Sequence, residues 1–184
     1  MQRDAGLGAT IKRRGSDEYC HPARPCGDPS GVAGTRFARR ARRDQRIAAV
    51  KRLLAAYAGT LVIMVALDLL WLGVIAKPLY QQGIGHLMAD KPLVPVAVLF
   101  YALFALGLVV FAVAPAGPAP GWGRTAATAA LFGFFAYATY DLTNLATLKH
   151  WPVGLSLLDI AWGTGVSAAA AVGGKALMDW TAGS

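Results

Sequence analysis

The sequence predicts an all-α polytopic membrane protein, a bundle of four transmembrane helices preceded by a basic N-terminal segment. Of the 184 residues, 55% are hydrophobic and only 15% are charged. The formal net charge of +8 arises within residues 1–52, which hold 13 of the 18 Lys and Arg side chains. The remaining residues have no net charge and are mostly apolar. This division excludes a soluble enzyme, a collagen-like chain and a disulfide scaffold.

Four apolar stretches are long enough to cross a hydrocarbon core about 30 Å thick, which takes roughly 20 helical residues. They are residues 53–76, 94–114, 125–148 and 153–174. Prolines and cations separate them, and both stop helices or favour the headgroup region. A soluble bundle would need polar helix faces, whereas the second stretch contains no charged side chain. We therefore expect a transmembrane domain over residues 50–176 and a short tail over 177–184.

The positions of Lys and Arg near the ends of the spans predict the orientation. One side of the membrane receives the cations between Arg39 and Arg52, together with Arg124 and Lys175. The other side receives only Lys77, Lys91 and Lys149. Because the side richer in cations is cytoplasmic, both termini are predicted to lie in the cytoplasm.

Residues 1–49 have no hydrophobic period and many Arg, Gly and Pro residues, which predicts disorder. Two alternatives remain open. The Arg cluster could lie on anionic lipid, or translation could start near Val50, so that the preceding residues are absent from the native protein. Cys20 and Cys26 flank His21, but this spacing matches neither a zinc motif nor a redox motif. We expect no metal site and no cofactor.

Three acidic residues, Asp68, Asp141 and Asp159, lie inside the predicted spans. An Asp at the centre of a membrane costs about 2.5 to 3.5 kcal/mol when it faces lipid, so all three should face protein or water. At 1.5 Å per residue they lie roughly 9 to 12 Å below the outer boundary. Antiparallel packing would therefore bring them to one level.

The neighbours of these acids are polar or aromatic. Trp71 stands three positions after Asp68, and Trp162 three positions after Asp159, so that each acid shares a helix face with an indole that can donate a hydrogen bond. In the third span, Tyr137, Asp141 and Asn144 form a polar stripe. The candidate intramembrane site comprises Asp68, Trp71, Tyr137, Asp141, Asn144, Asp159 and Trp162.

Two further patterns concern packing. Small side chains recur every four residues along the fourth span, at Ala161, Gly165, Ala169 and Gly173, which predicts close approach of another helix. Residues 78–89 predict a short helix lying on the membrane.

Intramembrane acids are candidates for functional sites, so the sequence favours binding or transport of a proton, a cation or a cationic headgroup. Two alternatives are a lipid-modifying enzyme or enzyme subunit, and a structural factor whose acids only lock helix packing. Catalytic residues are unknown, since no catalytic motif is visible, and a non-enzymatic role is favoured over an enzymatic one. The expected partner is the lipid bilayer, with a second copy or another membrane protein as a further partner and no nucleic acid.

Four stretches carry a family resemblance: residues 67–80 (LDLLWLGVIAKPLY), 85–90 (GHLMAD), 131–152 (LFGFFAYATYDLTNLATLKHWP) and 157–164 (LLDIAWGT). Through them the chain, from about Lys51 to Val172, resembles a bacterial membrane-protein family known as domain of unknown function 2177. The resemblance implies a small four-span protein of the bacterial inner membrane that begins near residue 50. It implies no activity, ligand or catalytic residue.

Overall fold

The computed structural model describes residues 31–117 and 121–183, and every element in this part of the chain is helical. The all-α class is therefore confirmed. The chain divides into two units, Met1–Arg40 and Ala41–Ser184. The helices are α1 (Gly31–Leu70), α2 (Lys77–Ile84), α3 (Val94–Leu108), α4 (Trp122–Thr147) and α5 (Val153–Gly183). π-Helical turns extend α1 over Trp71–Ile75 and α3 over Val109–Val113, and short 3-10 turns cover Gly85–Leu87 and Ala114–Ala116.

Helix α1 begins at Gly31, so residues 31–49, for which the composition predicted disorder, are helical. The prediction was wrong there because Ala, Arg and Gln are good helix formers, and no proline interrupts residues 31–77. Residues 1–30, including Cys20, His21 and Cys26, lie outside the described residues. Helix α5 continues to Gly183, through the segment predicted to be a tail.

Three helical stretches are long and apolar enough to cross a membrane: Ala38–Ile75, Val94–Ala116 and Val153–Gly183. They match the first, second and fourth predicted spans. The third predicted span, residues 125–148, is helical up to Thr147 as part of α4 but is not among them. Its Thr, Tyr, Asn and Asp side chains lower its hydropathy. Length and hydropathy thus support three spans where four were predicted.

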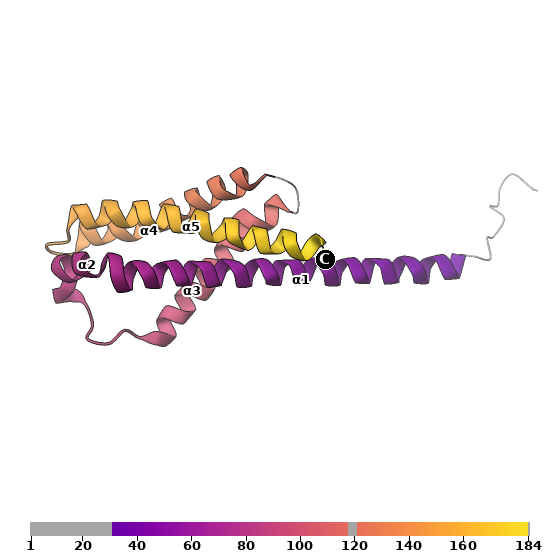
Figure 1. Ribbon diagram of the computed structural model, residues 1–184, viewed down its shortest axis with the longest axis horizontal. Helices are drawn as coiled ribbons and strands as arrows, with labels where there is room; N and C mark the ends of the chain where they lie inside the picture. The colour runs from indigo at the N-terminus through magenta and orange to yellow at the C-terminus, as the bar shows by residue number, and fades with distance from the viewer. Residues whose placement is uncertain (1–30, 118–120, 184) are drawn as a thin grey trace, which may run out of the picture. The chain divides into compact units, whose positions relative to one another are not determined.

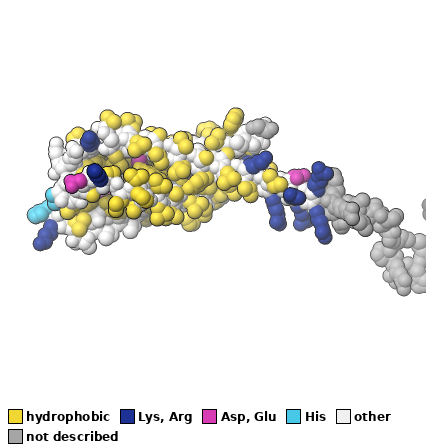
Figure 2. Space-filling model, turned by 90° about the horizontal axis from the view of Figure 1, so that it is seen from below, with side chains coloured by type: hydrophobic (Ala, Val, Ile, Leu, Met, Phe, Trp, Pro, Cys, Tyr) yellow, Lys and Arg dark blue, Asp and Glu magenta, His cyan; other side chains and the backbone are white. Residues whose placement is uncertain are grey.

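Many large apolar side chains lie on the outside of the helices. Val62 on α1, Leu103 on α3 and Leu157 on α5 are each more than half exposed. Figure 2 shows one face of the molecule. Apolar side chains cover its middle, whereas Lys and Arg side chains gather toward its ends. A soluble monomer does not expose apolar surface on this scale, so these faces belong in lipid.

Helices α4 and α5 pack against each other over most of their length (Figure 1). Glycines allow the close approach: a Cβ at Gly133 of α4 would overlap the Gly163 carbonyl and the Ser167 hydroxyl of α5. Further along α5, Gly174 lies against Ala56 and Thr60 of α1 in the same way. Helix α5 therefore contacts both α4 and α1 through its smallest side chains.

The small residues that make these contacts differ from the predicted ones. Ala161, Gly165 and Ala169 are exposed, and a Cβ at Gly165 would meet nothing within 4 Å. Only Gly173, against Ile63, packs closely as expected. The prediction of this ridge was wrong because α5 has small residues on several faces. Their spacing alone does not show which face packs against the other helices.

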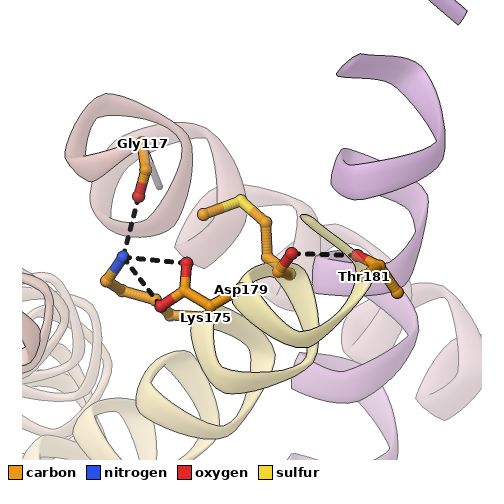
Figure 3. A network of polar contacts seen from close by, with 5 residues as sticks. Gly117, Lys175, Asp179 and Thr181 are labelled. Atoms are coloured by element: carbon orange, nitrogen blue, oxygen red, sulfur yellow. Dashed lines mark hydrogen bonds and ion pairs between the residues drawn. The ribbon is translucent and has the colours of Figure 1, made fainter. Parts of the chain in front are cut away.

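The C-terminal half of α5 is tied to the connection between α3 and α4 by Lys175, whose side chain is fully buried. Its ammonium group donates to the Gly117 carbonyl oxygen at 2.7 Å and forms an ion pair with Asp179 at 3.2 Å (Figure 3). The Thr181 hydroxyl donates to the Met178 carbonyl at 2.9 Å. Lys175 is roughly 24 Å along the helix from Asp159. This network thus lies well away from the candidate site.

Candidate functional site

A cavity of about 430 Å³ opens among the helices of the second unit. Eight of its lining side chains are aromatic and two are carboxylates. The lining residues are Asp68, Trp71, Leu72, Tyr80, Phe100, Tyr101, Phe104, Ala136, Tyr137, Tyr140, Asp159 and Trp162. Its size is typical of a small-molecule site, and such sites combine apolar walls with a few polar groups.

Asp68 lies two residues before the end of α1 and is only 3% exposed. Its carboxyl group accepts a hydrogen bond of 2.9 Å from the indole nitrogen of Trp162, on α5. Tyr101 of α3 interacts with the same carboxyl group. Asp68 is thus held by side chains from two other helices.

Asp159, near the start of α5, is 9% exposed and accepts a hydrogen bond from the Tyr80 hydroxyl of α2. Burial and the neighbouring Asp159 carboxylate raise the pKa of Tyr80 above its ordinary value. The hydroxyl therefore stays protonated and remains a donor. Asp159 is also within electrostatic range of Asp68.

The rings of Trp71 and Trp162 stack on each other, with centroids 4.2 Å apart and planes 6° from parallel. Each tryptophan was expected to bond the acid on its own helix. The Trp162 indole instead donates across helices, to Asp68 of α1 and not to Asp159 of α5. The Trp71 indole nitrogen is buried without a hydrogen-bond partner among the described residues. Trp71 also opens the π-helical turn, a feature frequent at functional sites.

Tyr137 of α4 forms another part of the wall. Its ring packs directly on the backbone of α5 at Gly163, where an added Cβ would overlap the ring. Its edge contact with Phe104 has a centroid distance of 6.0 Å and an interplanar angle of 81°. The ring is therefore fixed from two sides.

Two predicted site residues do not line the cavity. Asp141 is fully buried, and neither carboxyl oxygen has a hydrogen-bond partner among the described residues. It lies within electrostatic range of Asp159 and near the Ser156 hydroxyl. The Asn144 side chain is half-buried beside Tyr140. Five of the seven predicted residues thus share the cavity, and these two lie outside its lining.

Sequence reasoning missed most of the aromatic lining. Tyr80 was seen only as part of a surface helix, which the structure confirms as a helix, and Phe100, Tyr101 and Phe104 were not considered. The last three stand at i, i+1 and i+4 on one face of a mainly aliphatic span. That aromatic stripe was the available signal.

Long apolar helices with an apolar exterior, enclosing a cavity with buried acids, define an integral membrane protein. The chain belongs to the family described as predicted membrane protein (DUF2177), whose model matches residues 53–176. The match covers all five predicted site residues that line the cavity. No curated protein and no solved structure matches the chain.

Proposed function

We propose that the protein binds a cation in the aromatic cavity, as a four-span protein of the bacterial inner membrane with both termini in the cytoplasm. The observation that carries the proposal is the pair of buried carboxylates, Asp68 and Asp159, on one cavity. Two negative charges in a low-dielectric site repel each other, and a bound cation or proton relieves that repulsion. Helix α4 completes the bundle as the fourth span, which is supported by its exposed Leu131 and Phe135 side chains.

A structural role for the acids is the second candidate. It is favoured by the two hydrogen bonds that join helices, from Trp162 to Asp68 and from Tyr80 to Asp159. In membranes such bonds contribute about 0.6 to 2 kcal/mol each. An amide would preserve much of this contribution as a hydrogen-bond acceptor while removing the negative charge.

The two roles are separated by the substitutions Asp68→Asn and Asp159→Asn. Ligand binding to the folded state raises the melting temperature of the detergent-solubilised protein. We expect at least one of H⁺, Na⁺, K⁺ and tetramethylammonium, tested at constant ionic strength, to stabilise the wild type and not the double variant. Asp90→Asn is the matched control, because Asp90 lies exposed in the loop before α3.

The proposal fails if every cation shifts the melting temperature of the wild type and of the double variant equally. If the double variant is also markedly less stable in the absence of added cation, the structural role is favoured instead. For transport, a cation flux into liposomes that disappears in the double variant and persists in Asp90→Asn would extend binding to translocation.

A further inference from the structure

We infer that the ligand of this cavity is an alkylated ammonium group, such as a quaternary ammonium group, rather than an inorganic ion. The inference rests on the proposed function and narrows it to one chemical class.

The wall is mainly aromatic, with two tryptophans, four tyrosines and two phenylalanines. The face of an aromatic ring attracts a cation through its quadrupole, with Trp the strongest, and cages of such rings recognise quaternary ammonium groups. Each of the two carboxylates on the wall already accepts a hydrogen bond from Trp162 or Tyr80. They can therefore supply negative charge to a ligand that donates no hydrogen bond itself.

An inorganic cation needs different surroundings. Hard cations take six or more oxygen ligands at short range, and a cavity of about 430 Å³ is far larger than such a coordination shell. In the described part of the chain, no three His, Cys, Asp or Glu side chains are placed to hold a metal ion. An ammonium group that carries methyl groups instead fills apolar space while it is attracted by the rings and the carboxylates.

The cavity also reaches the outer surface of the helices. Leu72 of the π-helical turn, Phe100 of α3 and Tyr140 of α4 line it, and each is more than 40% exposed. Leu72 and Phe100 belong to stretches that are apolar enough to span the membrane. The same ammonium chemistry could therefore reach the site as a lipid headgroup or as a free cation.

The test compares choline with its neutral isostere, 3,3-dimethylbutan-1-ol, on the full-length protein in phosphatidylglycerol nanodiscs. Quenching of tryptophan fluorescence measures binding, because Trp71 and Trp162 line the cavity. We expect choline to bind at least about tenfold more tightly than the neutral isostere. Phe100→Leu removes an aromatic face at the partly exposed edge of the cavity and should weaken choline binding about tenfold. Trp122→Leu, away from the cavity, should leave binding unchanged.

Equal binding of choline and the isostere would overturn the inference, since the site would then be merely apolar. Saturable binding of Na⁺ or K⁺ without binding of choline would overturn the ligand class and leave cation binding intact. If no cation binds at all, the proposed function fails with it. Weaker apparent choline binding in phosphatidylcholine nanodiscs than in phosphatidylglycerol nanodiscs would identify a lipid headgroup as the source, and equal binding would identify a free cation.

Discussion

Two buried carboxyl groups in this protein differ in their hydrogen bonding. Asp68 accepts a hydrogen bond from Trp162, while Asp141 has no hydrogen-bond partner among the described residues. A buried polar group without a partner costs roughly 1 to 3 kcal/mol, and removing one partner of a buried bond costs a similar amount. The same substitution should therefore have opposite effects at the two sites.

We predict that Asp141→Val raises the free energy of unfolding by about 1 to 3 kcal/mol, because it removes an unpaired polar group. Asp68→Val should lower it by a similar amount, because the Trp162 indole N–H would lose its acceptor. Denaturation in mixed detergent micelles measures both. A loss of stability in Asp141→Val would show that its carboxyl group is partnered in the native protein.

Glycines at two positions on α5 provide a second contrast. A Cβ at Gly163 would overlap the Tyr137 ring, whereas a Cβ at Gly165 would meet no atom within 4 Å. We predict that Gly163→Ala costs about 1 to 3 kcal/mol and weakens ligand binding, because Tyr137 must move. Gly165→Ala is the control and should be neutral or slightly stabilising, because Ala favours helix. Thermal unfolding and choline titration of both variants check this, and equal effects would contradict the packing at Gly163.

At the scale of the element, the end of α5 depends on a buried charge. Lys175 is fully buried, while its partner Asp179 retains 28% exposure. Replacing a buried ion pair by apolar side chains is often neutral, but leaving one buried charge without its partner is costly. The two single substitutions are therefore not equivalent.

We predict that Lys175→Met changes the free energy of unfolding by less than about 1 kcal/mol, because Met fills the space and Asp179 can be hydrated. Asp179→Ala should cost more, roughly 1 to 3 kcal/mol, because the Gly117 carbonyl would then be the one acceptor left to the ammonium group among the residues that the structure describes. A double-mutant cycle measured by thermal unfolding separates the two effects. The reverse order of the two losses would contradict this account.

For the whole molecule, the number of spans and the side of the C-terminus are linked. With a cytoplasmic N-terminus, four spans return the C-terminus to the cytoplasm and three leave it outside. We predict that green fluorescent protein fused after Ser184 fluoresces and that alkaline phosphatase fused there is inactive, because the phosphatase needs the oxidising side of the membrane. Active phosphatase with a dark fluorescent fusion would contradict four spans with a cytoplasmic N-terminus.

Much of the helical layout could be predicted because it depends on local properties. Apolar length and the prolines and cations between the stretches located all four long helices, and the cost of a charge in lipid marked Asp68, Asp141 and Asp159 as inward-facing. All three are buried. The prediction was less successful for residues 31–49, where helix propensity outweighed a composition typical of disorder.

The sequence by itself determined that the protein is helical, that it belongs in a membrane and that acids lie inside its spans, since hydropathy and helical period are properties of single segments. Only the tertiary structure decided that Asp68 and Asp159 share a cavity while Asp141 does not line it. It also decided that Trp162 donates a hydrogen bond to Asp68 on another helix, and that aromatic rings from α2 and α3 complete the wall of the cavity. These pairings depend on how each helix is rotated and on the π-helical turn after Leu70, and no local pattern specifies how one helix is rotated against the next.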